Sequence, residues 1–120
     1  SAISDPHVAL WDSREPREYA GETPYREARG GHVPTAVGLH FATLMGADGR
    51  LLPEPELRAL LSAHGLGPNQ HVIAYCTGGV RSGFAYAVLR HLGYDSAANY
   101  DGSMWQWSAD PSRPLESATP

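Results

Sequence analysis

A short apolar run that leads into a helical pattern is the feature that most constrains the fold. Residues 71–75 read His-Val-Ile-Ala-Tyr, an apolar and partly β-branched run that is typical of a buried strand. Beyond a short loop, apolar side chains recur every fourth residue over 82–92, which predicts a helix that ends at Gly93. A buried strand followed closely by a helix favours an α/β fold.

The same alternation continues along the chain. Further strands are expected at 7–12, near 36–39 and at 97–100, and further helices at 15–20, 54–64 and 104–107. Ser13 is the expected cap of the first helix and Ser82 that of the helix over 82–92. Such alternation predicts a mostly parallel sheet, whose ligands bind beyond the carboxyl ends of the strands. Asp12 and Cys76 lie at such ends and are candidate functional residues.

Composition excludes several functions. The 120 residues, 42% of them hydrophobic, are expected to form one domain over 1–120 with its own core. The formal net charge is -4 and no basic run occurs, so nucleic acid and anionic membranes are not expected partners. All 9 cationic side chains are Arg, and the absence of Lys excludes Schiff-base and P-loop lysine chemistry.

Cys76 is the single cysteine. The chain therefore cannot form an internal disulfide, a multi-cysteine zinc site or a Cys-x-x-Cys redox pair. The histidines show no metal-ligand spacing, and we expect neither a metal nor an organic cofactor. No apolar run approaches the roughly 20 residues that span a bilayer, and residues 1–6 do not resemble a signal peptide. We expect a soluble protein in a reducing compartment, the cytoplasm.

The candidate chemistry lies in the loop 76–83, Cys-Thr-Gly-Gly-Val-Arg-Ser-Gly. Its adjacent glycines let the backbone adopt positive φ, so that successive N–H groups can converge on an anion, and the following helix adds partial positive charge. These donors would lower the pKa of the Cys76 thiol and favour a reactive thiolate. Arg81 adds a fixed positive charge or braces the loop. The alternative, a small apolar core cysteine, explains none of the loop around it.

The spacing from Cys76 to Arg81 is Cys-x4-Arg. This loop resembles the six-residue active-site loop of the rhodanese (sulfurtransferase) family, which begins with the cysteine that forms a persulfide. Tyrosine phosphatases use Cys-x5-Arg, whose extra residue opens a cradle for a tetrahedral phosphoryl group. The tighter loop of this chain is expected to suit sulfur.

Four further motifs extend the resemblance over residues 8–116. They are Asp12-Ser13-Arg14, similar to Asp-x-Arg; Gly31 to Ala36, similar to Gly-His-Ile-Pro-Gly-Ala; Asn99 to Trp107, similar to Tyr-Asp-Gly-Ser-Trp-x-Glu-Trp; and Arg113 to Glu116, similar to a Pro-Val-Glu ending. The likeness is strongest to the catalytic C-terminal domain of two-domain sulfurtransferases that act on thiosulfate or 3-mercaptopyruvate. The chain is expected to be a stand-alone domain or the catalytic half of such a protein.

Departures from these motifs leave the sulfur donor open. Met104 and Gln106 replace Trp and Glu in the third motif. Glu18 stands where the two-domain enzymes place an Arg that contacts the anionic substrate. Thr77 and Gly78 stand where thiosulfate enzymes often carry cations. The loop also differs from the Cys-Gly-x-Gly-Val-Thr pattern common in mercaptopyruvate enzymes.

The resemblance implies a rhodanese-like fold, with a mostly parallel central sheet flanked by helices and the active-site loop between a central strand and a helix. It implies that the Cys76 thiolate takes sulfane sulfur from thiosulfate or 3-mercaptopyruvate as a persulfide and passes it to cyanide or a thiol. The residues expected to bind the substrate are Thr77, Gly78, Gly79, Val80, Arg81, Ser82 and Arg14. An inactive rhodanese domain or a sulfur-accepting protein is a further expected partner.

Two other functions stay open. The chain could be a persulfide carrier or a regulatory rhodanese module whose persulfide serves a partner protein. A small-anion phosphatase or arsenate-type reductase could use the same loop, but the Cys-x4-Arg spacing speaks against it.

Several other residues have structural alternatives to a role in catalysis. Asp12 and Arg14 could reach the site, but we expect them to pair with each other or to brace neighbouring loops. His32 could act as a base, but its Gly and Pro neighbours favour a hydrogen-bonded turn former. Trp105 and Trp107 are expected to pack in the core rather than to wall a pocket.

Overall fold

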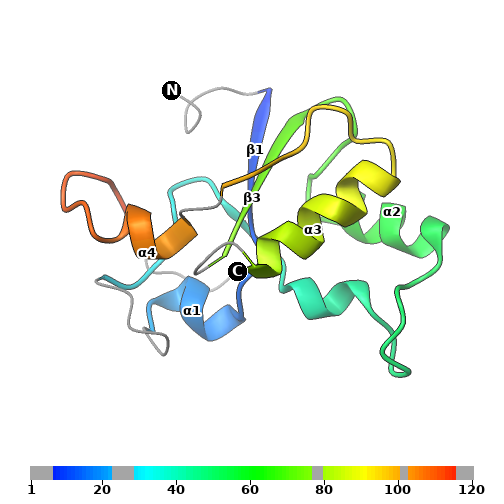
Figure 1. Ribbon diagram of the computed structural model, residues 1–120, viewed down its shortest axis with the longest axis horizontal. Helices are drawn as coiled ribbons and strands as arrows, with labels where there is room; N and C mark the ends of the chain where they lie inside the picture. The colour runs from blue at the N-terminus through cyan, green and yellow to red at the C-terminus, as the bar shows by residue number, and fades with distance from the viewer. Residues whose placement is uncertain (1–6, 23–28, 77–79, 101–102, 116–120) are drawn as a thin grey trace.

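The computed structural model describes residues 7–22, 29–76, 80–100 and 103–115, which form an α/β fold around a parallel sheet (Figure 1). The strands of this part of the chain are β1 (Val8–Asp12), β2 (Val37–Gly38), β3 (His71–Tyr75) and β4 (Ala98–Asn99). Their order in the sheet is β2-β1-β3-β4, and each neighbouring pair is parallel. The predicted α/β fold with a mostly parallel central sheet is confirmed.

Helices occupy the links between the strands. They are α1 (Pro16–Ala20), the 3-10 helix η1 (Phe41–Leu44), α2 (Glu54–Ala63), α3 (Val80–His91) and α4 (Ser103–Trp107). Every predicted strand and helix is present near its expected bounds, whereas η1 was not expected. None of the helices in the described ranges has the length and apolarity needed to cross a membrane.

Both predicted helix caps are wrong. α1 is capped by Glu15, which forms a capping box with Glu18 in which each side chain accepts the backbone N–H of the other. The Ser13 hydroxyl instead donates to the Tyr75 carbonyl oxygen at 2.9 Å and joins the end of β1 to β3. Ser82 lies two residues inside α3, where its hydroxyl contacts side chains of other elements. A serine hydroxyl can cap a helix or form a hydrogen bond to a residue that is distant in the sequence, and sequence alone does not separate these two roles.

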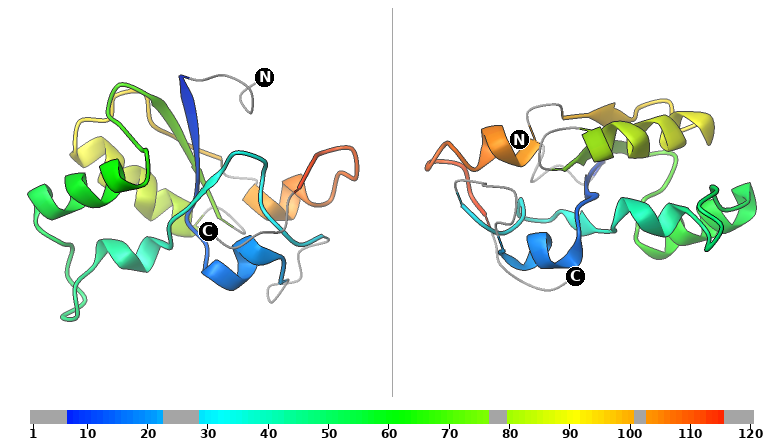
Figure 2. Two further views of the ribbon diagram at one scale, coloured as in Figure 1. Left: turned by 180° about the vertical axis from the view of Figure 1, so that it is seen from behind. Right: turned by 60° about the horizontal axis from the view of Figure 1, so that its bottom comes forward.

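The sheet is covered on both faces. Alternate strand residues point to opposite sides, and those on each side join a separate buried apolar cluster. Trp11 and Val72 belong to a buried cluster with apolar residues of α2 and α3. Leu10 and Tyr75 belong to a second cluster that includes Met104 of α4. Figures 1 and 2 accordingly show α2 and α3 on one side of the strands and α4 on the other.

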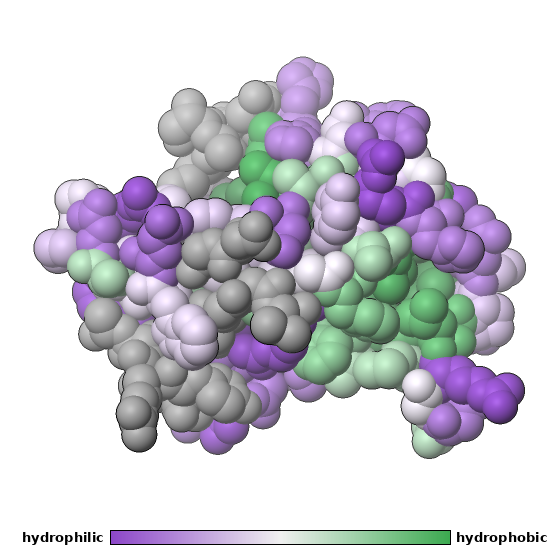
Figure 3. All heavy atoms as spheres, viewed as in Figure 1, coloured by the Kyte–Doolittle hydropathy of each residue, from purple (hydrophilic) through white to green (hydrophobic). Residues whose placement is uncertain are grey.

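Apolar surface gathers beside α3. Figure 3 shows it between α3 and η1, where Phe84 and Phe41 are half-buried and meet edge-on with ring centroids 6.0 Å apart. This contact continues the larger cluster outward and fixes η1 against α3.

The expectation that Trp105 packs in the core is wrong, since it is 57% exposed. The five-residue helix α4 buries Ser103 and Met104, and Trp105 lies on the solvent side. Trp107 is half-buried and stacks edge-on against Tyr100.

Candidate active site

Cys76 follows β3 at the carboxyl edge of the sheet, where α/β folds bind ligands. Its N–H donates to Ser103 Oγ at 3.0 Å, and its carbonyl oxygen accepts the Met104 N–H at 3.0 Å. Ser103 has a φ of 47°, a left-handed conformation that is uncommon outside glycine, and its hydroxyl donates to the Tyr100 carbonyl oxygen at 2.7 Å. Figures 1 and 2 show the end of β3 between α3 and α4, so the cysteine is held from both sides.

The surroundings of the Cys76 side chain are polar, although Cys76 is only 1% exposed. The Ser82 hydroxyl of α3 lies 3.6 Å from Sγ, and the same oxygen lies 2.5 Å from Oδ1 of Asn99 on β4. A cysteine that only fills an apolar core is expected to contact apolar side chains rather than a serine hydroxyl. The polar environment therefore favours a reactive thiol over a core-filling one.

Part of the loop lies outside the described residues. Thr77, Gly78 and Gly79, all expected to bind substrate, fall in this gap, as does the side chain of Val80. α3 begins at Val80 and runs for 12 residues, so a helix follows Cys76 as closely as the loop pattern predicts. The partial positive charge of that helix N-terminus favours an anion at the sulfur.

Arg81 braces the start of α3 against α1. Its guanidinium donates to both carboxylate oxygens of Glu18, with Nη1–Oε1 at 2.8 Å and Nη2–Oε2 at 3.0 Å. The Glu18 side chain is fully buried, and that of Arg81 is 20% exposed. The Glu18 carboxylate therefore neutralises part of the charge of the loop arginine.

Asp12, Arg14 and Tyr75 form a buried network at the carboxyl ends of β1 and β3. Arg14 donates from Nε and Nη2 to the Asp12 carboxylate, at 2.9 and 2.7 Å, and from Nη2 to the Gly31 carbonyl oxygen at 2.7 Å. The Tyr75 hydroxyl donates to Asp12 Oδ2 at 2.9 Å and accepts the Val33 N–H at 3.1 Å. These contacts fit the structural alternative, in which Asp12 and Arg14 pair with each other and brace neighbouring loops.

Burial controls the ionisation of this network. It raises the pKa of the Tyr75 phenol well above the usual value of 10.0, and the neighbouring Asp12 carboxylate raises it further. Burial lowers the pKa of Arg14, but the hydrogen bond and charge of Asp12 outweigh it, so that the pKa is raised. Tyr75 therefore stays neutral and Arg14 charged over the physiological range.

Arg14 is 1% exposed, and it borders a small pocket of about 200 Å³ with Tyr19, His40 and His64. His32 is held by Nδ1 at 2.9 Å from the Tyr19 carbonyl oxygen, and its ring stacks on that of Tyr19 with centroids 3.6 Å apart. These contacts fit the turn-forming alternative for His32. Within the described parts of the chain, no group of three His, Cys, Asp or Glu residues is placed to hold a metal ion.

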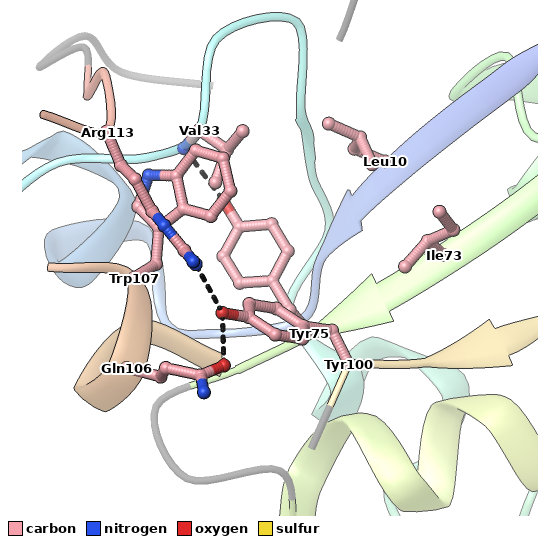
Figure 4. Close-up of a pocket in the computed structure, with 8 residues that line it drawn as sticks. All are labelled: Leu10, Val33, Ile73, Tyr75, Tyr100, Gln106, Trp107 and Arg113. Carbon is pink, nitrogen blue, oxygen red and sulfur yellow. Dashed lines mark hydrogen bonds between the residues drawn. The ribbon is translucent and has the colours of Figure 1, made fainter. Parts of the chain in front are cut away.

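A larger pocket of about 510 Å³ opens on the face of the sheet that carries α4 (Figure 4). Leu10 and Ile73 form its floor on the strands, while Trp107 and Arg113 lie on the opposite side. The Tyr100 hydroxyl donates to Gln106 Oε1 at 2.6 Å and accepts a hydrogen bond from Arg113 at 3.0 Å. Trp107 thus lines a pocket, although it was expected from the sequence to pack in the core.

Two contacts of the site were missed at the level of sequence. Asn99 directly precedes the Tyr-Asp-Gly-Ser run, and its contact with Ser82 joins β4 to α3. Glu18, which departs from the family pattern, pairs with Arg81 across 63 residues. An acidic residue in place of an expected basic one was the available signal for this pair.

Comparisons with known proteins identify the family of the chain. The family model described as Rhodanese-like domain matches residues 1–110. The thiosulfate sulfurtransferase of Pseudomonas aeruginosa is 35% identical over 116 residues, which make up 97% of this chain and 42% of that protein. The sulfur carrier protein TtuD of Thermus thermophilus is 36% identical over 107 residues, 82% of this chain and 38% of that protein.

A solved structure of EanB, with a cysteine persulfide in a tetrahedral intermediate state with ergothioneine, matches with a TM-score of 0.88 and 25% identity. The match covers 99% of this chain and 30% of that one. The chain spans about 40% of the length of the curated relatives described above.

Proposed function

The chain belongs to the rhodanese-like family, and from that premise we propose that it is a sulfurtransferase in which Cys76 carries sulfur as a persulfide. The observation that carries the proposal is the polar setting of Cys76 at the carboxyl end of β3, between α3 and α4. The thiosulfate sulfurtransferase of Pseudomonas aeruginosa supports the same reaction class.

The proposed reaction has two halves. The Cys76 thiolate attacks the outer sulfur of the donor, so that a new S–S bond forms while the bond from that sulfur to the rest of the donor breaks. Thiosulfate then releases sulfite, and 3-mercaptopyruvate releases pyruvate, which takes up a proton at the carbon that loses sulfur. In the second half, cyanide or a thiol attacks the outer persulfide sulfur and restores the Cys76 thiolate.

Backbone donors are proposed to carry most of the stabilisation. The N–H groups of residues 77–82, Thr77, Gly78, Gly79, Val80, Arg81 and Ser82, would face the anionic sulfur, and the N-terminus of α3 would add to them. Arg81, held by Glu18, would fix the end of the loop and lend it a partly neutralised charge. Arg14, which pairs with Asp12 through Nε and Nη2, would act on substrate through the position of that loop.

A steady-state assay tests the proposal, with thiosulfate and 3-mercaptopyruvate as donors and cyanide as acceptor. We expect parallel double-reciprocal lines, the mark of a covalent intermediate, and loss of turnover in Cys76→Ser. Donor alone should add about 32 Da, one sulfur atom, to the wild-type chain and nothing to the variant. Full turnover in a folded Cys76→Ser variant would remove Cys76 from the mechanism.

A persulfide carrier is the second candidate, favoured by the likeness to the sulfur carrier protein TtuD. A carrier would take up sulfur on Cys76 and hold it until a sulfur-accepting protein binds. The two functions separate in the same experiment, because a carrier forms the adduct while turnover to cyanide stays negligible. An aryl phosphate in a parallel assay tests the phosphatase alternative, for which no turnover is expected.

A further inference from the structure

The Ser82 hydroxyl lies between two acceptors, the Asn99 amide oxygen and the Cys76 sulfur. Its oxygen is 2.5 Å from Asn99 Oδ1 and 3.6 Å from Cys76 Sγ. The three side chains come from α3, β4 and the end of β3, and Ser82 is fully buried. At such a buried site, hydrogen bonds between protein groups are stronger than in water, because the local dielectric constant is low.

A serine hydroxyl has one hydrogen, so it can donate to the amide oxygen or to the sulfur but not to both. When Cys76 is a neutral thiol, the S–H can donate to Ser82 while the Ser82 hydroxyl donates to Asn99 Oδ1. When the sulfur is an anion it has no hydrogen, and the Ser82 hydroxyl must turn toward it to form a charge-assisted bond.

Asn99 can serve both states, because its side chain has an acceptor and a donor that exchange places on rotation. With Oδ1 toward Ser82 it accepts, as in this structure. After rotation of the amide, Nδ2 donates to the Ser82 oxygen and leaves the hydroxyl hydrogen for the sulfur. Nδ2 now lies on the side of Gly83, 3.6 Å from where a Cβ would stand, so position 83 contributes no side chain that restricts this rotation.

We propose that Ser82 and Asn99 form a hydrogen-bond relay that reverses direction with the charge on the Cys76 sulfur and stabilises its anionic form. Ser82 touches the reacting sulfur and is a catalytic residue in this scheme, whereas Asn99 acts through Ser82 and is a positioning residue. The relay concerns the thiolate directly, and its extension to the persulfide rests on the proposed function.

The pH dependence of iodoacetamide alkylation tests the relay, because Cys76 is the only cysteine and the signal reports it alone. Ser82→Ala should raise the alkylation midpoint by about one pH unit, a tenfold loss of thiolate below it. Ser82→Thr keeps a hydroxyl and should restore most of the shift. Ser108→Ala is the matched control, since Ser108 is equally buried but donates to the Met104 carbonyl oxygen, and its midpoint should equal that of wild type.

Asn99→Asp, made alone and together with Ser82→Ala, shows whether Asn99 acts on the Cys76 thiolate through Ser82 or through charge. A carboxylate can only accept from Ser82, so it holds the hydroxyl away from the sulfur and should raise the midpoint at least as far as Ser82→Ala. If Asn99→Asp acts through Ser82, its effect should shrink to less than half when Ser82 is already Ala. An undiminished effect in the double variant would assign it to charge alone and overturn the role of Asn99.

The relay and the proposed function fail in distinguishable ways. Alkylation needs no sulfur donor, so a raised midpoint in Ser82→Ala without any sulfur transfer by wild type would keep the relay and reject the sulfurtransferase. A midpoint unchanged in Ser82→Ala would overturn the relay whatever the turnover. If Ser82→Ala does not fold, as judged by circular dichroism, Ser82→Gly removes the hydroxyl in its place, alone and combined with Asn99→Asp, and an unchanged midpoint in Ser82→Gly would also overturn the relay.

Discussion

Glu18 and Arg81 form a two-point ion pair that joins α1 to the first turn of α3. The distances are 2.8 and 3.0 Å, and the carboxylate is fully buried while the guanidinium is 20% exposed. Two parallel N–H···O bonds fix the relative orientation of both groups and therefore hold the start of α3 against α1. Loss of Arg81 would take two charge-assisted hydrogen bonds from a carboxylate that water does not reach.

Arg81→Ala is therefore expected to lower the free energy of unfolding by about 1.5–3 kcal/mol, since the buried Glu18 carboxylate would lose both hydrogen bonds from the guanidinium. Urea unfolding followed by circular dichroism measures the change. Glu54→Gln is the matched control, because the Glu54–Arg58 pair has a similar distance of 2.7 Å but side chains 56% and 45% exposed. Its removal should cost about 0.5 kcal/mol or less. Equal costs for the two variants would contradict a structural role for the buried pair.

Glu18→Gln tests what the same pair does to substrate. On the proposed function, the amide would still accept a hydrogen bond from Arg81 but would no longer cancel its charge. Thiosulfate is a dianion, so its KM should fall by roughly three- to tenfold, in keeping with about 0.7–1.4 kcal/mol of Coulomb attraction. The gain should fade as salt is added. Glu54→Gln changes the net charge equally and should leave KM unchanged, and an equal fall there would assign the effect to net charge.

The fold was predictable because its elements carry strong local patterns. The apolar run at 71–75 and the period over 82–92 produced β3 and α3 almost at their expected bounds. The parallel sheet followed from the alternation of strands and helices. The caps were not predictable, since Ser13 and Ser82 turn to partners that only the assembled fold brings near.

The candidate site was predictable only in part. The position of Cys76 between a strand and a helix follows from the sequence, because the loop residues are contiguous. The pairing of Arg81 with Glu18 and of Ser82 with Asn99 depends on how α1 and β4 pack against α3, which local periodicity does not encode. The expected burial of Trp105 was wrong because a five-residue helix is too short for its buried face to be predicted from the spacing of apolar residues.

Gly30 is expected to tolerate no side chain. A Cβ at this position would lie 1.9 Å from the carbonyl oxygen of Gly21, and a backbone atom cannot move aside as a flexible side chain can. Gly30→Ala should lower the free energy of unfolding by about 2 kcal/mol or more. Gly67→Ala is the control, since its Cβ would meet only the Gln70 side chain at 3.7 Å. Thermal or urea unfolding compares the two, and a stable Gly30→Ala chain would contradict the close approach of these segments.

Tyr75 is expected to make stability fall in alkaline solution. Burial, with the Asp12 carboxylate, raises its pKa well above 10.0, whereas the phenol of the unfolded chain ionises near that value. Above pH 10 the unfolded state has therefore lost a proton that the folded state keeps, and the free energy of unfolding falls by about 1.4 kcal/mol per pH unit. The contribution is complete below pH 10 and disappears as the pH rises through the folded-state pKa.

Tyr75→Phe isolates this effect from other alkaline transitions. The variant loses the bonds to Asp12 and Val33, which should cost about 1–3 kcal/mol at neutral pH. Its stability should then decline less steeply than that of wild type between about pH 10 and 11.5, by about 1.4 kcal/mol per pH unit. Tyr94→Phe is a useful comparison, because burial raises the pKa of Tyr94 as well but without a neighbouring carboxylate among the causes. If the slopes of wild type and Tyr75→Phe coincide, the Tyr75 phenol ionises in the folded chain as readily as in the unfolded one, and the buried network does not hold its proton.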